Sequence, residues 1–143
     1  MNVQKIIYSQ QEVEYVARLL IQKLKTCKIF TFQGPLGAGK TTLIRQLLEQ
    51  LGIKGEITSP TFTYLNVYVN DKQETFYHFD LYRIGSVDEF ITAGFNEYLY
   101  QPNSWTLIEW PEVVAPLLTH DVCNIAIDYG QDLHTRELTI RCV

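Results

Sequence analysis

The chain has 143 residues, of which 46% are hydrophobic and 20% charged, and this length favours one domain, residues 1–143, with a sizeable core. Its formal net charge is −4 at pH 7, and its 12 lysines and arginines are scattered rather than gathered in a stripe, which argues against direct binding to DNA or to an RNA backbone. No apolar run has the length of a signal peptide or a transmembrane helix, so we expect a cytoplasmic protein that does not enter a membrane.

An edge strand over residues 3–8 and a helix from about residue 10 to 26 are the first predicted elements. Ser9 and Glu12 have the spacing of a capping box, which marks the start of a helix. The apolar residues that follow fall on one helical face: Val13, Val16, Ala17, Leu20 and Leu24.

A phosphate-binding motif comes next, between a predicted strand and a predicted helix. Residues 29–32 are β-branched or aromatic and predict a short buried strand, whereas apolar residues recur at helical spacing from 43 to 51, until Gly52 provides a C-cap. Between them, Gly34-Pro35-Leu36-Gly37-Ala38-Gly39-Lys40-Thr41 fits the pattern Gly, four residues, Gly-Lys-Thr. The motif requires this order of strand, loop and helix.

Each residue type in the motif has a chemical task. The glycines allow sharp turns that aim backbone N–H groups at phosphate oxygens, and the start of the helix adds unpaired N–H groups. Lys40 is expected to reach the β and γ phosphates, and the Thr41 hydroxyl to ligate Mg²⁺. The residues expected to bind the nucleotide are Gly37, Ala38, Gly39, Lys40, Thr41 and Thr42. A glycine-rich turn that merely starts a helix is the alternative interpretation.

The rest of the chain predicts strands and short helices. A β-rich segment follows Pro60 and, beyond the turn-forming Asn70-Asp71-Lys72, pairs with residues 74–80 as an antiparallel hairpin. A helix follows from the capping box Ser86-Val87-Asp88-Glu89 to Gly94, with a further helical turn within 95–100. A strand over 105–110 and a short helix from Pro111 toward Leu118 come next. The last predicted element is a hairpin of 122–128 with 136–142. Together they predict an α/β fold: a three-layer sandwich like that of P-loop NTPases, with a mixed, mainly parallel central sheet and antiparallel hairpins at its edges.

The cysteines and histidines give no sign of a structural metal. Cys27, Cys123 and Cys142 have no Cys-x-x-Cys spacing and lie beside apolar residues, so we expect buried or half-buried free thiols. His78, His120 and His134 also lack metal-ligand spacing, and the metal expected is the one carried with the nucleotide.

Two carboxylates are candidates to complete the active site. Glu109 ends the apolar run from Trp105, and the carboxyl ends of central strands face the ligand crevice in open α/β sheets. It either organises Mg²⁺, directly or through water, or orients the attacking water, and we favour the metal. Asp80 ends the preceding hairpin strand, with a turn cap or an ion pair to Arg83 as the alternatives.

Other side chains near these strand ends keep two interpretations. Thr61 is placed like a switch residue that senses γ-phosphate and Mg²⁺, or it is a hydroxyl at the start of a strand. Trp110 and the tyrosines could stack on a base, but aromatic residues in strands more often belong to the core.

Four motifs in this order closely resemble the TsaE (YjeE) family, the bacterial ATPases of threonylcarbamoyladenosine tRNA modification. They are the phosphate loop, Ser59-Pro60-Thr61-Phe62-Thr63, Tyr77-His78-Phe79-Asp80-Leu81-Tyr82-Arg83 and Leu107-Ile108-Glu109-Trp110. The resemblance implies a Mg²⁺-dependent ATPase, weak on its own, that supports modification of adenosine next to the anticodon and works with the partners TsaD and TsaB. These partners, rather than this chain, would hold the tRNA and transfer the carbamoyl group.

The resemblance also assigns residues. It implies that Thr41 and Glu109 are metal-site residues, that Asp80 matters for activity, and that Ser9 and Arg136 line the nucleotide site. Pro35 departs from the family pattern, in which an acidic residue is common at this position, and proline removes one backbone donor there.

Two other classes of nucleotide-binding protein, small-molecule kinases and GTPases, would need further motifs. A small-molecule P-loop kinase would need a lid with several arginines, and the five arginines do not cluster in sequence. A GTPase would need the guanine-reading sequence Asn-Lys-x-Asp, which this sequence lacks. The kinase remains the alternative to the ATPase.

Overall fold

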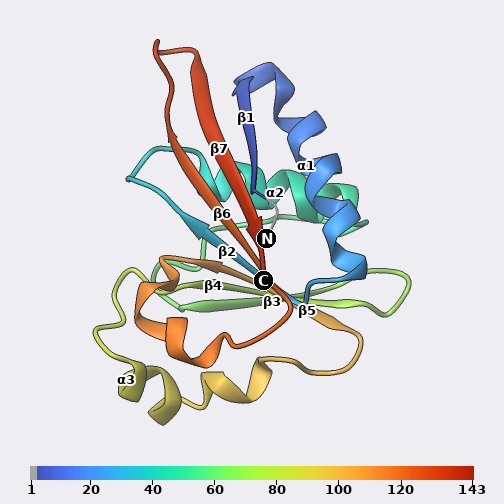
Figure 1. Cartoon of the computed structure of the whole chain (residues 1–143). Helices are drawn as coiled ribbons and strands as arrows, with labels where there is room; N and C mark the ends of the chain where they lie inside the picture. The colour runs from blue at the N-terminus through green and yellow to red at the C-terminus, as the bar shows by residue number, and fades with distance from the viewer. Residues whose placement is uncertain (1–2) are drawn as a thin grey trace.

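The computed structural model describes residues 3–143, whose strands form one seven-stranded sheet in the order β1-β7-β6-β2-β5-β4-β3 (Figure 1). The strands are β1 (Val3–Ser9), β2 (Ile29–Gln33), β3 (Leu65–Val69), β4 (Thr75–Asp80), β5 (Ser104–Glu109), β6 (Val122–Tyr129) and β7 (Thr135–Cys142). The α-helices are α1 (Val13–Ile21), α2 (Lys40–Gln50) and α3 (Val87–Thr92), and the 3-10 helices are η1 (Gln10–Glu12), η2 (Gln22–Lys25), η3 (Phe95–Tyr98) and η4 (Pro111–Leu117).

The centre of the sheet is parallel and its edges are antiparallel, as predicted. Strands β6, β2, β5 and β4 pair in parallel, whereas β3 pairs antiparallel with β4, and β7 pairs antiparallel with both β6 and β1. Every residue from Ile29 to Phe32 in β2 is buried, because this central strand is covered on both faces. The run of β-branched and aromatic residues that predicted a buried strand therefore has its expected place.

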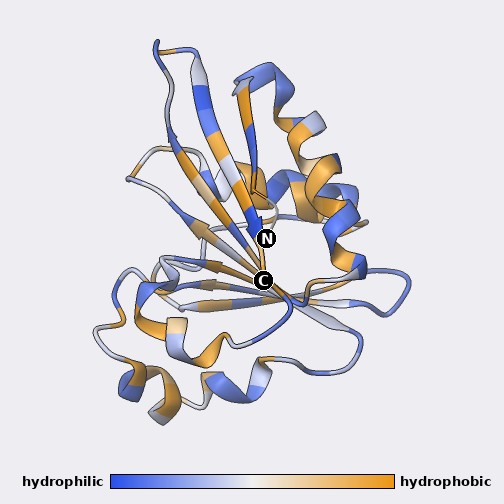
Figure 2. Cartoon of the chain, viewed as in Figure 1, coloured by the Kyte–Doolittle hydropathy of each residue, from blue (hydrophilic) through white to orange (hydrophobic). Residues whose placement is uncertain are grey.

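Helices cover both faces of the sheet, which gives the predicted three-layer α/β architecture. Helices α1 and α2 lie on one side and α3 on the other (Figure 1). On the first side they pack on a core that includes Phe30, Phe32 and Leu107, and on the second side Phe90 of α3 packs within 5.4 Å of Phe79, measured between ring centroids. Hydrophobic and hydrophilic residues alternate along α1, as in a helix with one buried face (Figure 2).

The first helix is shorter as an α-helix than predicted. The interval from residue 10 to 25 is helical throughout, but only Val13–Ile21 is α-helix, and the polar ends form the 3-10 helices η1 and η2. Helix termini commonly tighten in this way. The Ser9 N–H group donates to Glu12 Oε1 at 2.9 Å, so the carboxylate half of the capping box is present.

The β-rich segment after Pro60 is also shorter than predicted, because β3 begins only at Leu65. The Tyr64 N–H group donates to the Pro60 carbonyl at 2.7 Å in a turn, and Tyr64 has a positive φ of 68°. The Ser59 and Thr61 hydroxyls at this turn lie 2.9 Å apart. This irregular stretch brings Thr61 to the carboxyl ends of the central strands.

The helices of residues 3–143 include none that is both long enough and apolar enough to cross a membrane.

Candidate functional site

The glycine-rich loop joins the carboxyl end of β2 to the start of α2. Gly37 and Gly39 have φ values of 78° and 105°, in the region that favours glycine, and Gly39 is the N-cap of α2. Helix α2 starts at Lys40, so the free N–H groups of its first turn and the positive end of its dipole lie at the loop. Loop and helix together have the geometry of an anion-binding site, and phosphate binding here stays a prediction.

Gly34 fixes the position of this loop against the neighbouring strand. A Cβ atom at Gly34 would lie 2.3 Å from the carbonyl oxygen of Ile127 in β6. We expect Gly34→Ala to lower the free energy of unfolding by about 1–3 kcal/mol and to weaken nucleotide binding, because the clash moves the loop. Urea denaturation and nucleotide titration measure the two effects.

Gly55→Ala is the matched control for that substitution. Gly55 has a φ of 90° but no atom within 4 Å of its Cβ position, so alanine there introduces backbone strain without a clash. Equal losses of stability in the two variants, with unchanged nucleotide affinity, would contradict the proposed packing of Gly34 against β6.

Lys40 is buried at the base of the loop, with 5% of its surface exposed. Its Nζ donates to the Gly34 carbonyl and, at 3.3 Å, to the Pro35 carbonyl, and lies 3.7 Å from the centre of the Trp110 ring. Burial lowers the pKa of Lys40, whereas the carboxylates of Glu109, Glu112 and Asp80 act in the opposite direction. Phosphate oxygens are natural partners for an ammonium group held by carbonyls and a ring face.

Pro35 takes part in the loop through its carbonyl oxygen. The Ala38 N–H group donates to it at 3.1 Å, which closes a turn, and Lys40 Nζ is the second donor. The N–H group that proline lacks is therefore not required for this turn.

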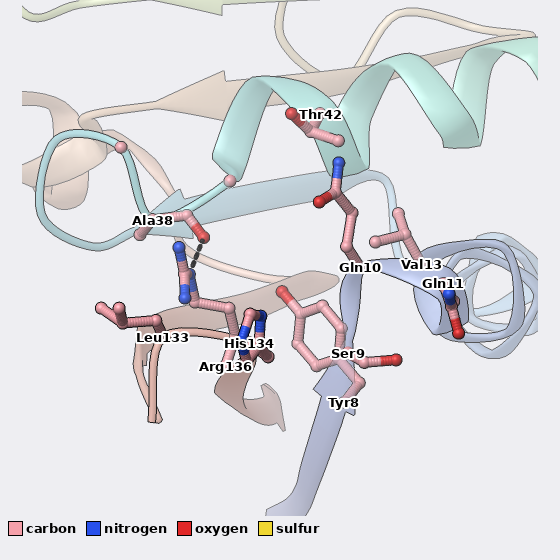
Figure 3. Close-up of a pocket in the computed structure, with 12 residues that line it drawn as sticks. Tyr8, Ser9, Gln10, Gln11, Val13, Ala38, Thr42, Leu133, His134 and Arg136 are labelled. Carbon is pink, nitrogen blue, oxygen red and sulfur yellow. Dashed lines mark hydrogen bonds between the residues drawn. The ribbon is translucent and has the colours of Figure 1, made fainter. Parts of the chain in front are cut away.

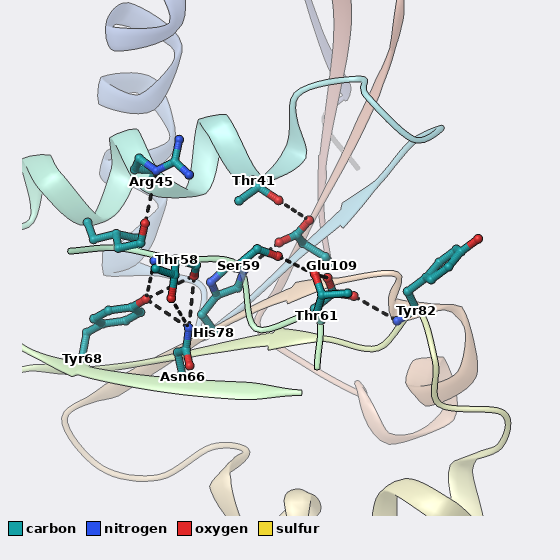
Figure 4. A network of polar contacts seen from close by, with 12 residues as sticks. Thr41, Arg45, Thr58, Ser59, Thr61, Asn66, Tyr68, His78, Tyr82 and Glu109 are labelled. Atoms are coloured by element: carbon teal, nitrogen blue, oxygen red, sulfur yellow. Dashed lines mark hydrogen bonds and ion pairs between the residues drawn. The ribbon is translucent and has the colours of Figure 1, made fainter. Parts of the chain in front are cut away.

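Thr41, Glu109 and His78 form a hydrogen-bonded row at the start of α2 (Figure 4). Thr41 Oγ1 donates to Glu109 Oε1 at 2.8 Å, and His78 Nε2 lies 2.7 Å from Glu109 Oε2. The three residues come from α2, β5 and β4, and only 3% of Glu109 is exposed. The predicted metal pair of Thr41 and Glu109 is thus in direct contact.

This donor set fits Mg²⁺. The ion prefers hard oxygen ligands in octahedral geometry at about 2.0–2.1 Å, so that neighbouring ligands lie about 2.9 Å apart. The Thr41 and Glu109 oxygens, 2.8 Å apart, match this spacing, and one is a hydroxyl and the other a carboxylate. Glu109 can bind such an ion directly or through water.

Asp80 and Thr61 form a second contact beside this row. Thr61 Oγ1 donates to Asp80 Oδ2 at 3.2 Å, and Asp80 Oδ1 accepts the Tyr82 N–H group at 3.0 Å. Asp80 and Glu109 are register partners in the parallel pair β4–β5, so their side chains leave the same face. Asp80 therefore caps a turn and also holds Thr61. Within residues 3–143 it makes no ion pair with Arg83, whose guanidinium lies 4.6 Å from the Phe62 ring centre.

His78 is a site residue that spacing analysis missed. It is fully buried, its Nε2 lies 2.7 Å from Glu109 Oε2, and its Nδ1 has no hydrogen-bond partner among the described residues. Strand periodicity could have found it, because His78 lies two residues before Asp80 and so shares its face. We interpret His78 as a positioning residue that orients the Glu109 carboxylate.

We expect His78→Ala to lower kcat for ATP hydrolysis by about 10- to 100-fold and to leave the KM for ATP within a few-fold, as for other groups that orient a ligand. Steady-state phosphate release measures both constants. His120→Ala is the control, because His120 stacks on Tyr100 near the surface. A rise in KM with an unchanged kcat would contradict the positioning role.

A cleft of about 530 Å³ opens on the other side of the loop (Figure 3). This volume is typical of small-molecule sites. The lining residues include Gly37, Ala38, Gly39 and Thr42 from the loop and α2, Tyr8, Ser9, Gln10, Gln11 and Val13 from the amino-terminal elements, and Leu133, His134 and Arg136 from the β6–β7 hairpin. Residues from the two ends of the chain thus meet at the phosphate loop.

The hairpin also holds the loop in place. Arg136 Nε donates to the Ala38 carbonyl at 3.3 Å, and the Tyr129 hydroxyl donates to the Leu36 carbonyl at 2.5 Å. Ser9 and Arg136, which only the family resemblance suggested, do line the cleft, and Tyr8 and His134 join them without any motif that marks them. Trp110 lies instead against Lys40 and Tyr82, away from this lining.

The predicted site residues thus fall on two sides of one loop. Ser9, Arg136 and Thr42 lie on the cleft side. Thr61, Asp80 and Glu109 lie at the strand ends, with Thr41 in contact with Glu109. The arrangement can hold a nucleotide in the cleft with its phosphates on the loop. The binding and catalytic roles of these residues stay predictions.

Comparison with known proteins assigns the chain to a family. Residues 7–138 match the family model described as "Threonylcarbamoyl adenosine biosynthesis protein TsaE". The tRNA threonylcarbamoyladenosine biosynthesis protein TsaE of Rickettsia felis is 37% identical over 124 residues, which cover 86% of this chain and 71% of the relative. The protein of the same name from Haemophilus influenzae is 38% identical over 121 residues, 83% of this chain and 75% of the relative.

A solved structure has a similar fold. The crystal structure of Bacillus subtilis YdiB matches with a TM-score of 0.70 at 28% sequence identity, and the match covers 100% of this chain and 88% of that one. Sequence and fold agree over nearly the whole length, and the chain belongs to the TsaE family of threonylcarbamoyl adenosine biosynthesis proteins.

Proposed function

We propose that the protein is a Mg²⁺-dependent ATPase that supports threonylcarbamoyl modification of adenosine next to the anticodon of tRNAs. The hydrogen bond of 2.8 Å between Thr41 and Glu109, at the start of the helix that follows the glycine-rich loop, carries the ATPase part of the proposal. The tRNA part rests on the family and on the names of its members. We propose that this activity takes place in the cytoplasm.

Each side of the loop has its own task in this proposal. Adenosine lies in the cleft between Tyr8, Ser9 and Arg136, and the triphosphate follows the loop toward Lys40. Lys40 exchanges its carbonyl partners for phosphate oxygens. Arg136, held by the Ala38 carbonyl, adds positive charge beside the loop.

The strand ends would support hydrolysis. Thr41 and Glu109 would hold Mg²⁺, which would neutralise charge on the phosphates. His78 Nε2, 2.7 Å from Glu109 Oε2, orients the Glu109 carboxylate. Asp80 accepts a hydrogen bond from the Thr61 hydroxyl at 3.2 Å, and this hydroxyl would sense the γ-phosphate and Mg²⁺. These groups come from α2, β4, β5 and the segment before β3.

Turnover is proposed to be slow in the isolated protein. The arginines near the site already have partners: Arg45 Nε donates to the Ile57 carbonyl at 3.3 Å, Arg136 Nε to the Ala38 carbonyl, and the Arg83 guanidinium lies over Phe62. An arginine that stabilises the transition state can raise turnover by about 10³- to 10⁵-fold when a partner supplies it. We infer that TsaD and TsaB complete the site, and that ATP binding and hydrolysis regulate that complex rather than transfer the carbamoyl group.

Reconstitution with the partners tests this proposal. ATP turnover is measured for the chain alone, with TsaD and TsaB, and with both proteins and tRNA, and the modified nucleoside is assayed in parallel. We expect at least about 10-fold faster turnover in the complete mixture, and modification that requires this chain and ATP. Full turnover by the chain alone with a small-molecule phosphate acceptor would support the kinase instead.

A further inference from the structure

The three cysteines meet at the end of the sheet opposite the glycine-rich loop. Their Sγ atoms all lie within 4.8 Å of one another. Cys27 precedes β2, Cys123 lies near the start of β6, and Cys142 ends the antiparallel strand β7, whereas the glycine-rich loop follows the carboxyl end of β2. All three are free thiols, as predicted, but their positions in sequence gave no sign that they form a cluster.

Strand register brings two of these thiols together. Cys123 and Cys142 are register partners in the pair β6–β7. The adjacent partners Val122 and Val143 exchange both backbone hydrogen bonds, at 3.1 and 2.8 Å, so the cysteine pair is the closer, non-hydrogen-bonded kind. The Cys142 thiol donates to Cys123 Sγ at 3.5 Å. Cys27 approaches from the chain segment between η2 and β2.

The sulfur spacing is that of a metal-thiolate site. Three thiolates at about 2.3 Å from a common ion lie about 4.0 Å apart in trigonal geometry. The Sγ atoms of Cys123 and Cys142 are 3.5 Å apart, which is slightly less than this value, and all three Sγ atoms lie within 4.8 Å of one another. Within residues 3–143 the cluster contains sulfur ligands alone, with no carboxylate or imidazole. Such a soft donor set suits Cu(I), whereas zinc sites normally require four ligands.

The cluster also has access to solvent. Cys27 and Cys123 are buried, but Cys142 is half-buried and lines a cavity of about 290 Å³ together with Gln4, Lys23, Thr26 and Ile140. An ion could enter through this cavity, and the Lys23 ammonium there offsets part of the negative charge that three thiolates bring. Thr26 Oγ1, 3.9 Å from Cys27 Sγ, is the nearest described hydroxyl contact.

We propose that Cys27, Cys123 and Cys142 form a three-coordinate site for a soft monovalent metal ion, Cu(I). Each thiol loses its proton to solvent and its sulfur forms one bond to the ion, with no change in oxidation state. Burial raises the pKa of Cys27 and of Cys123, so these two thiols are protonated and unreactive in the absence of metal. A bound ion ties β7 and β6 to the segment before β2, and we therefore expect it to raise Tm.

Competition for copper tests the proposal. Reduced protein is titrated without oxygen against a Cu(I) complex of the chromogenic chelator bathocuproine disulfonate. We expect the protein to withdraw one copper ion per chain. Cys142→Ala should weaken this binding by more than about 100-fold, beyond the effect of an outer-shell partner. Arg141→Ala, one residue away on the same strand and exposed, is the matched control and should bind as the unmodified chain does.

Several results would overturn the proposal. They are no withdrawal of copper, equal binding by Cys142→Ala, or tighter binding of Zn(II) than of Cu(I) in a parallel titration. Formation of a Cys123–Cys142 disulfide in place of copper binding would also overturn it. Circular dichroism and thermal unfolding check the fold, and Cys142→Ser gives a second, smaller change at the same half-buried position. The assay contains no nucleotide, so its outcome is independent of the proposed ATPase.

Discussion

Lys40→Ala is expected to abolish ATP binding, with Kd raised by at least about 100-fold, equivalent to about 3 kcal/mol. The Lys40 ammonium is the buried cation of the glycine-rich loop, and the carbonyls of Gly34 and Pro35 that now hold it leave it free to exchange for phosphate oxygens. Isothermal titration with ATP in the presence of Mg²⁺ measures the loss.

Lys54→Ala is the control for charge alone. Lys54 is exposed and pairs with Asp71 at 2.9 Å on the surface, so its removal gives the same change of net charge away from the loop. We expect its affinity for ATP to stay within about two-fold, because exposed charges are screened by salt. If Lys40→Ala remains folded and binds ATP as tightly as Lys54→Ala does, the loop is not the phosphate site.

Glu109→Gln is expected to reduce ATP turnover by at least about 100-fold while ATP affinity changes only a few-fold. The substitution keeps the shape of the side chain but removes the carboxylate that faces both the Thr41 hydroxyl and His78. The phosphates keep their contacts with the loop and Lys40, so binding persists. Steady-state phosphate release and ATP titration separate the two effects.

Glu112→Gln is the matched control for Glu109→Gln. Glu112 lies three residues further along, is exposed, and acts on Lys40 only through its charge. Its turnover should remain close to that of the unmodified chain. Equal losses of ATP binding in Lys40→Ala and Glu109→Gln would refute the division between a binding loop and a metal-organising carboxylate.

The architecture was predictable where local pattern and topology agree. The β-branched and aromatic residues of Ile29–Phe32 specify a buried strand. The glycine motif and the apolar face of residues 43–51 specify the loop and helix after it. Glu109 was predictable because a short apolar run ends on a carboxylate, and the parallel pairing of β2 with β5 then places it beside the loop.

The remaining features depend on long-range register, which no local pattern encodes. His78 meets Glu109 only because β4 pairs in parallel with β5, and Cys123 meets Cys142 only because of the β6–β7 register. Tyr8 reaches the cleft because β1 pairs with β7, so that the two ends of the chain lie together. The late start of β3 follows from the backbone turn between Pro60 and Tyr64, in which the Tyr64 N–H group donates to the Pro60 carbonyl and Tyr64 has a positive φ.

A crystal structure with Mg²⁺ and a non-hydrolysable ATP analogue tests most directly whether the loop and the strand ends form one site. We predict the triphosphate on the N–H groups of Gly37 to Thr41, the adenosine in the cleft beside Tyr8 and Arg136, and Mg²⁺ next to the Thr41 hydroxyl, with Glu109 bound to it directly or through one water. Mg²⁺ bound away from Glu109, or a nucleotide outside the cleft, would contradict the account.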